Sequence, residues 1–243
     1  MSIKDLNFME RSLLFAKLAS IAYNEPKEVK KQARKLGFTT VEYYDNDGAQ
    51  AYRFQNKSDL VIACRGTQPR EYQDLGADMR AWPAVSETVS RVHKGFKKEV
   101  DDLWPMISED IDRTVNLKKD LWFCGHSLGA AMATLCASRM EDWVEELYTY
   151  GSPRVGTRGF VKNAHVTHWR FVNNNDIVTR VPLALMGYKH HGNLCYINHY
   201  GKIRKMTMWQ RIKDKFRGYR DGLLDGAKDH GMTNYVNYTI KED

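Results

Sequence analysis

The run Gly125-His126-Ser127-Leu128-Gly129-Ala130 constrains the fold of this chain more than any other feature. It carries the pattern Gly-x-Ser-x-Gly and follows an apolar run that ends at Cys124, and small residues dominate from Leu128 to Met140. The apolar run predicts a buried strand and the small residues predict a helix, so the pattern marks a sharp strand–turn–helix junction. Such a turn strains its central residue and lifts a serine hydroxyl above the edge of a sheet. Ser127 is therefore our candidate nucleophile.

Apolar runs and periodic stretches alternate along the rest of the chain. The predicted strands cover residues 38–44, 49–54, 59–65, 120–124, 147–150, 168–172 and 194–197, and the predicted helices cover residues 6–23, 27–36, 92–111 and 128–140. Strands that alternate with helices are typical of an α/β fold with a mainly parallel sheet. The 243 residues suffice for one sizeable core, and no repeat or linker divides them, so we expect a single domain over residues 1–243.

A carboxylate that could orient a catalytic base follows the nucleophile motif. In α/β-hydrolases the order along the chain is serine, then aspartate or glutamate, then histidine. Asp176 comes after the predicted strand 168–172 and three consecutive asparagines, so it lies on a loop at the carboxyl end of a strand. We therefore take Asp176 as the candidate acid.

The same order selects among the eight histidines, because only those after Asp176 qualify as the base. They are His190, His191, His199 and His230. His230 stands in a late loop that can return over the sheet, and the pair His190 and His191 is the alternative. His126 is adjacent to the nucleophile but leaves the turn in another direction, so we expect it to pack in the turn.

An oxyanion hole needs two hydrogen-bond donors. The first is the backbone N–H of Leu128, directly after the nucleophile. The second is expected from Arg65-Gly66-Thr67-Gln68, which follows the predicted strand 59–65. Thr67 offers both its backbone N–H and its hydroxyl there.

In combination, these motifs resemble the fungal-type (class 3) triacylglycerol lipases, in a bacterial form. The resemblance runs from about residue 59 to the end of the chain and rests on Arg65-Gly66-Thr67, Val92-His93-Lys94-Gly95-Phe96, residues 125–130, 150–156 and 173–182, and Asp229-His230. It implies an α/β-hydrolase fold with a mostly parallel sheet flanked by helices. It also implies a triad of Ser127, Asp176 and His230, with Thr67 in the oxyanion hole. No cofactor or metal is expected.

Members of this family often cover the site with a lid between the Arg-Gly-Thr and Val-His-x-Gly-Phe motifs. That interval is residues 68–91 in this chain, and the apolar Leu75, Met79 and Trp82 within it favour a lid over a docked surface loop. We therefore expect a serine lipase that hydrolyses acylglycerol esters through an acyl-enzyme. A carboxylesterase for short soluble esters and a phospholipase A1 are the alternatives.

The net charge of +7 is concentrated in one segment. Residues 201–220 hold eight basic residues and one acidic residue, and apolar residues recur there every three or four positions. The segment predicts a basic amphipathic helix whose apolar stripe packs on the domain and whose basic face is solvated. Alternatively, residues 202–220 make peripheral contact with an anionic lipid surface. A nucleic-acid partner is not expected.

The start of the chain has no signal-peptide pattern, and no stretch is long and apolar enough for a transmembrane helix. The four cysteines are far apart and form no Cys-x-x-Cys pair, which favours reduced thiols over disulfides or a metal site. We therefore expect a cytoplasmic protein, with signal-independent export left open.

Overall fold

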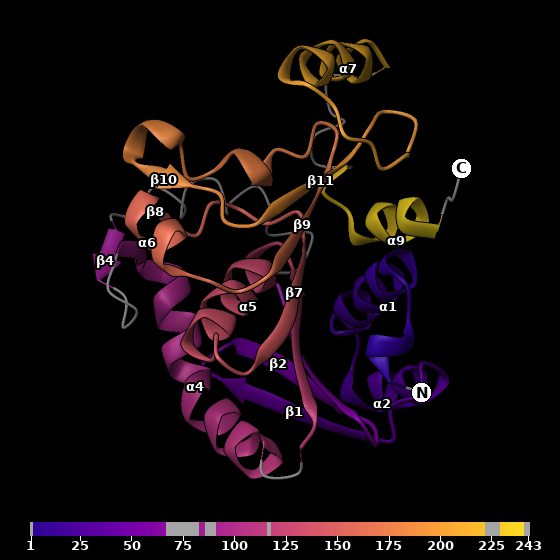
Figure 1. Cartoon of the computed structure of the whole chain (residues 1–243), viewed down its shortest axis with the longest axis vertical. Coiled ribbons are helices and arrows are strands. Elements are labelled where there is room, and N and C mark those ends of the chain that lie inside the picture. Colours follow the sequence, from indigo (N-terminus) through magenta and orange to yellow (C-terminus); the bar gives the residue numbers. More distant parts are fainter. Residues whose placement is uncertain (1, 67–82, 86–90, 116–117, 222–228, 241–243) are drawn as a thin grey trace.

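The computed structural model describes residues 2–66, 83–85, 91–115, 118–221 and 229–240. Its main feature is a seven-stranded sheet in the order β1-β2-β3-β6-β7-β9-β11 (Figure 1). The strands of this sheet are β1 (Thr40–Asn46), β2 (Ala49–Gln55), β3 (Asp59–Cys64), β6 (Asp120–His126), β7 (Val144–Tyr150), β9 (His168–Asn173) and β11 (Asn193–Ile197). Strands β1, β2 and β3 pair antiparallel, and all pairs from β3 to β11 are parallel.

Helices cover both faces of this sheet, with α4 and α5 on one side and α1, α2 and α9 on the other (Figure 1). The helices are α1 (Phe8–Ile21), α2 (Pro26–Lys35), α4 (Lys94–Val115), α5 (Leu128–Arg139), α6 (Arg158–Asn163), α7 (Met208–Asp221) and α9 (Met232–Ile240), with 3₁₀ turns η1 (Ile3–Asp5), η3 (Val178–Arg180) and η4 (Ala184–Met186). This arrangement confirms the expected α/β-hydrolase fold with a mostly parallel sheet flanked by helices. No helix in the described part of the chain combines the length and apolar character needed to cross a membrane.

The core is split in two because the central strands are buried on both faces. Leu60 and Ile62 of β3 join a cluster with α4 and α5, whereas Val61 and Ala63 join a cluster with α1. Side chains alternate between the faces of a strand, so an uninterrupted apolar run is what two covered faces require. The parallel strands therefore end together at one edge of a rigid layer, where the loops after β6, β9 and β11 meet.

A second, smaller sheet was not predicted from the sequence. It has the order β10-β8-β5-β4 and consists of β4 (Pro83–Val85), β5 (Arg91–His93), β8 (Gly156–Thr157) and β10 (Tyr188–Lys189). Its strands have two or three residues each, too few to show an alternating pattern. The predicted helix over 92–111 accordingly begins later, at Lys94, because Val92 and His93 belong to β5.

The basic segment folds into α7 as expected, but the orientation predicted for its apolar stripe is wrong. Met208, Trp209 and Phe216 are 64%, 71% and 67% exposed, whereas the basic Arg211 and Lys215 are half-buried. The helix lies at the outer edge of the molecule beyond β11 (Figure 1). The partial burial of Arg211 and Lys215 shows that part of its charged face is turned inward. Hydrogen bonds hold this face against the domain, since buried Asp214 accepts from the Tyr196 hydroxyl and from the His199 backbone N–H, each at 3.0 Å.

Candidate active site

Ser127 occupies a strained turn between β6 and α5. Its backbone has φ of 58° and ψ of −127°, a conformation that non-glycine residues rarely adopt. The Ser127 backbone N–H donates to the Tyr150 carbonyl at 3.1 Å, which fixes the turn against β7. A Cβ at Gly125 or Gly129 would collide with backbone atoms of the neighbouring segment. The two glycines of the motif therefore permit the close approach of strand and helix that lifts the serine hydroxyl.

The structure brings Ser127, His230 and Asp176 together in one hydrogen-bonded chain. The Ser127 hydroxyl lies 2.7 Å from Nε2 of His230. Nδ1 of His230 lies 3.0 Å from Oδ1 and 2.9 Å from Oδ2 of Asp176. Because Nδ1 faces a carboxylate, it carries the proton and donates it, which leaves Nε2 free to accept the serine proton. All three predicted triad residues thus stand in the positions that acyl transfer requires.

The Asp176 carboxylate is held from two further sides. The backbone N–H of Val178 donates to Oδ1 at 2.9 Å, and the hydroxyl of Tyr235, on α9, donates to Oδ2 at 2.6 Å. Burial and the Asp176 charge raise the pKa of Tyr235 well above its ordinary value, so this phenol stays protonated and keeps donating. Gly151 faces the same groups at φ +60°, and a Cβ there would lie 2.8 Å from both Oδ2 of Asp176 and Nδ1 of His230. Sequence reasoning named neither Tyr235 nor Gly151 as part of the site.

His126 packs in the turn as expected, and it also supports the base. Its Nε2 donates to the backbone carbonyl of His230 at 2.7 Å, and its Nδ1 accepts from the Tyr23 hydroxyl at 2.8 Å. The two imidazole rings stack with centroids 4.6 Å apart. Burial and the neighbouring His230 lower the pKa of His126 well below its usual range, so His126 stays neutral. The pattern His-Ser in the motif was the only sequence signal for this contact.

Asp229 connects the loop that carries the acid to the loop that carries the base. Its Oδ2 accepts from the backbone N–H of Asn175 at 3.0 Å, and its backbone carbonyl accepts from the Asn173 side chain at 2.9 Å. The Asn173 backbone N–H in turn donates to the Tyr235 hydroxyl at 3.0 Å. The asparagine run before Asp176 is therefore a set of hydrogen-bond donors that fixes the distance between Asp176 and His230.

The remaining histidines after Asp176 lie elsewhere. His191 donates from Nε2 to the Ala164 carbonyl at 3.0 Å, and its Nδ1 lies 2.9 Å from Nδ1 of His168. His190 faces a cluster of arginines, and His199 stacks edge-on against Tyr200. None of the three is bonded to Ser127, so the alternative base, His190 or His191, is not supported by this geometry. His93 packs against Phe96 with ring centroids 4.2 Å apart.

Of the two predicted oxyanion donors, Leu128 lies among the described residues and Thr67 does not. Leu128 is the first residue of α5, directly after the nucleophile, so its backbone N–H lies at the positive end of the helix. Thr67 lies outside the described residues, as does almost all of the predicted lid segment 68–91. The described Gly66 runs alongside the nucleophile, because a Cβ on it would lie 3.3 Å from Cβ of Ser127. The segment before Thr67 therefore passes next to the reacting hydroxyl.

The triad is shielded from water in this structure. Ser127 and His230 have no exposed surface, and Asp176 is 1% exposed. A hydrogen-bonded serine–histidine–carboxylate chain in a dry environment is suited to nucleophilic attack on an acyl carbon, since the serine proton has a single acceptor.

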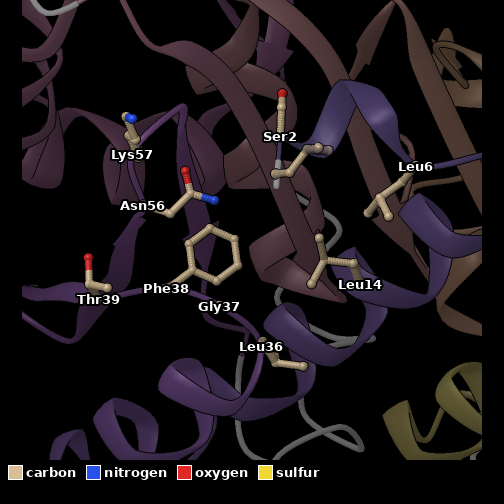
Figure 2. A pocket seen from close by; sticks show the side chains of 10 residues that line it. Ser2, Leu6, Leu14, Leu36, Gly37, Phe38, Thr39, Asn56 and Lys57 are labelled. Atoms are coloured by element: carbon tan, nitrogen blue, oxygen red, sulfur yellow. The ribbon is translucent and has the colours of Figure 1, made fainter.

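An apolar cavity of about 290 Å³ lies at the opposite end of the main sheet. Figure 2 shows Leu6 and Leu14 on one side of it, Phe38 and Asn56 on the other, and Leu36 below them. Asn56 lies in the short turn between β2 and β3, at the amino end of β3, whereas the triad follows the carboxyl ends of the parallel strands. Ligands of parallel α/β sheets bind at the carboxyl ends. This cavity is therefore separate from the catalytic residues.

The chain also matches a known protein family. Residues 61–186, about half of the chain, match the model of the family described as "Lipase (class 3)". The chain is 40% identical to toxin TseL of Vibrio cholerae over 60% of its own length and 30% of that protein. It is 30% identical to the secreted mono- and diacylglycerol lipase MDL2 of Malassezia globosa over 67% of its own length and 61% of that protein. The chain thus spans less than two thirds of these relatives.

Solved structures show the same fold. The Rhizomucor miehei lipase in its propeptide complex superposes with a TM-score of 0.67 at 23% identity, covering 78% of this chain and 68% of that one. A structure described as "A serine protease triad forms the catalytic centre of a triacylglycerol lipase" superposes with a TM-score of 0.68 at 23% identity. It covers 78% of this chain and 80% of that one. At this level of identity the likeness concerns the fold.

Proposed function

Since the chain belongs to the class 3 lipase family, we propose that it is a serine hydrolase that cleaves carboxylic ester bonds of acylglycerols. The observation that carries this proposal is the hydrogen-bonded chain from the Ser127 hydroxyl through His230 to Asp176, with 2.7 Å between Oγ and Nε2. Each group has one role in acyl transfer: nucleophile, general base and orienting carboxylate.

The first half-reaction forms an acyl-enzyme. His230 takes the proton from Ser127 through Nε2 as Oγ attacks the ester carbonyl, and the resulting imidazolium is stabilised by Asp176. The negative charge on the former carbonyl oxygen meets the backbone N–H of Leu128 and, we propose, that of Thr67. His230 then returns the proton to the leaving alcohol, and the carbon–oxygen bond of the ester breaks.

The second half-reaction releases the acid. Water enters where the alcohol left, His230 takes one of its protons, and the hydroxide attacks the acyl carbon bound to Oγ of Ser127. Collapse of the second tetrahedral intermediate frees the carboxylic acid, and His230 returns the proton to Ser127. The neutral His126 behind the base keeps the His230 backbone in place throughout, because its Nε2–H donates to that carbonyl.

Apolar side chains on the surface near the acid loop support a lipid substrate. Ile177, directly after Asp176, is 47% exposed, and Leu183 and Leu185 of the same segment are 56% and 98% exposed. Large aliphatic side chains in water favour contact with an apolar phase. Two of the relatives reported above are an acylglycerol lipase and a triacylglycerol lipase, and this segment fits the same class of substrate.

An ester chain-length series tests the proposal. p-Nitrophenyl esters from acetate to palmitate, together with emulsified monoolein and triolein, are measured below and above the substrate's aggregation threshold. We expect Ser127→Ala to lose activity on every ester by several orders of magnitude, with Ser138→Ala, on the same helix, as the matched control. Activity confined to short soluble esters would make the protein a carboxylesterase. Release of fatty acid from phosphatidylglycerol vesicles would favour a phospholipase A1. Activity that survives Ser127→Ala would refute the triad.

The four cysteines in the structure are buried and free. Free thiols are consistent with the reducing compartment expected from the sequence. The cytoplasmic location, the single domain over residues 1–243 and the lid within 68–91 stay predictions.

A further inference from the structure

A second cavity of about 290 Å³ lies between α7, the loop after Asp176, and strands β9 and β11. Five of the side chains that line it are cationic: Arg154, Arg170, Arg180, Arg211 and Lys215. They come from four separate parts of the chain, the loop after β7, strand β9, turn η3 and helix α7. The fold therefore collects positive charge from distant positions into one hollow.

The described lining of the cavity holds cationic groups and no carboxylate. The nearby Asp214 of α7 accepts hydrogen bonds from Tyr196 and His199 and does not line the cavity. Arg170 is 7% exposed, its Nε has no hydrogen-bond partner, and no ion pair to its guanidinium is present among the described residues. A buried cation without a counter-charge is costly, so an anionic ligand in the cavity would stabilise Arg170.

The cationic groups are close enough to act on one another. Burial, reinforced by Arg154 and Arg211, lowers the pKa of Arg170 to about 10. Burial and the neighbouring Arg180, Arg211 and Arg154 lower the pKa of Lys215. The imidazole of His190, beside the same arginines, is held neutral because burial and their charge lower its pKa to about 2. An anion in the cavity would relieve this mutual repulsion.

Two of the arginines are fixed in place before any ligand arrives. Nη1 of Arg154 donates to the backbone carbonyls of Arg180 and of Pro182, the latter at 2.8 Å. Nη2 of Arg180 donates to Oδ1 of Asn175 at 3.2 Å. Helix α7 is joined to this frame, because the Lys215 carbonyl accepts from the Asn175 side chain at 3.2 Å. Fixed donors lose little entropy on binding, as an anion site requires.

We propose that this cavity is a binding site for a phosphate group, carried by a phosphate ester. The planar guanidinium forks match two phosphate oxygens at a time, which makes arginine clusters typical phosphate sites. The volume exceeds that of a single small ion, and the remaining lining includes apolar Val172, Leu194 and Ile212. A phosphate with an organic substituent satisfies both parts of the lining.

This inference is independent of the proposed ester hydrolysis. None of the cationic residues belongs to the triad, and the test measures binding without turnover. Isothermal titration calorimetry at low ionic strength is performed with inorganic phosphate and with glycerol 1-phosphate. We expect saturable binding of both compounds, with the higher affinity for the ester. Arg170→Gln and Arg211→Gln should each lower the affinity about tenfold or more relative to the parent, since each variant loses a charge-assisted hydrogen bond.

Lys213→Gln is the matched control, because Lys213 is exposed on the same helix and does not line the cavity. It removes the same charge and should leave the affinity within about twofold. Arg211→Gln lies at a half-buried surface position, so it retains the fold even if Arg170→Gln does not.

Vesicles identify the source of the phosphate. Flotation is measured with phosphatidylcholine vesicles containing phosphatidic acid or phosphatidylglycerol. If Arg211→Gln reduces flotation and Lys213→Gln does not, the phosphate belongs to a lipid headgroup. If flotation is unchanged while soluble phosphate binding is lost, the ligand is a soluble phosphate ester. The proposal is overturned if phosphate does not bind saturably, or if Lys213→Gln weakens binding as much as Arg211→Gln does.

Discussion

The loop from Asn173 to Pro182 separates two buried polar regions that handle charge in opposite ways. On the side of the triad, the carboxylate of Asp176 is met by His230, the Val178 N–H and the Tyr235 hydroxyl. On the side of the cationic cavity, Arg170 and its neighbours have no carboxylate among the described lining residues. The charges on the side of the triad are paired within the protein, which suits a reaction, whereas the described lining of the cavity holds cations and no carboxylate, which suits an anionic ligand. We call these two regions the matched side and the unmatched side.

The largest effect should follow from breaking the matched side. Asp176→Asn removes the charge that orients His230, and by analogy with serine triads in general it should lower kcat about 10³- to 10⁴-fold without unfolding the protein. Asp229→Asn, next to the base in sequence, is the control and should cost about tenfold at most, because Asp229 contacts the loop backbone and not the imidazole. Steady-state hydrolysis of p-nitrophenyl butyrate gives both values. A larger loss in Asp229→Asn would reassign the acid.

Acid should destabilise both regions, through histidines that are buried neutral. Burial lowers the pKa of His126, His168, His190 and His191. Below pH 6.5 the unfolded chain takes up protons that the folded chain refuses, so the free energy of unfolding falls by about 1.4 kcal/mol per pH unit for each such histidine.

Urea titrations at pH 7.5 and 5.5 measure this slope. His190→Gln, on the cavity side, should reduce it by about one histidine's share. Equal stability at the two pH values would contradict the neutral state assigned to these rings.

A smaller effect should follow from weakening the matched side without removing its charge. Tyr235→Phe deletes one donor to Asp176 and leaves the Val178 N–H and His230 in place, so kcat should fall about tenfold with KM nearly unchanged. Tyr148→Phe is the control, since the Tyr148 hydroxyl donates to Oε2 of Glu146 at 2.5 Å and has no part in the triad. If the two variants fall equally, the Tyr235 contact serves packing alone.

The smallest and most diagnostic effect concerns two buried arginines. Arg139 is 8% exposed at the side chain, pairs with Asp101 and lies 4.9 Å above the Trp104 ring, so Arg139→Gln should destabilise the fold by about 2 kcal/mol. Arg170→Gln removes a charge that no described residue balances. It should leave the free energy of unfolding within about 1 kcal/mol of the parent or raise it. Urea titrations without phosphate compare the two, and a larger loss for Arg170→Gln would show that its charge is matched after all.

The sequence predicted the matched side well because chemistry there depends on local patterns. The Gly-x-Ser-x-Gly turn and the order of acid and base pointed to Ser127, Asp176 and His230, and the structure brings these three together. The supports Tyr235 and Gly151 could not be predicted, since they meet Asp176 only after α9 and β7 have packed into place. Tyr235 lies in none of the motifs, and residues 150–156 carry the resemblance without indicating that Gly151 approaches Asp176.

The cationic cavity on the unmatched side could hardly be predicted from the sequence. The basic segment was found, but its orientation was predicted wrongly, because periodicity cannot tell that Asp214 anchors the charged face of α7 inward. Arg154 and Arg170 lie in stretches that read as loop and strand, and only the fold brings them next to Arg211. A site assembled from five residues in four separate parts of the chain leaves no motif.

The packing of α9 against α1 joins the last described α-helix to the first one, and His230 lies two residues before α9. During synthesis the nucleophile and the acid are made long before the base, 103 and 54 residues earlier. A growing chain that has formed the sheet and the turn around Ser127 therefore still has no proton acceptor for this residue. The proposed ester hydrolysis therefore depends on the docking of α9 as well as on the sheet, so an assay of it would report whether this end of the described chain is in place.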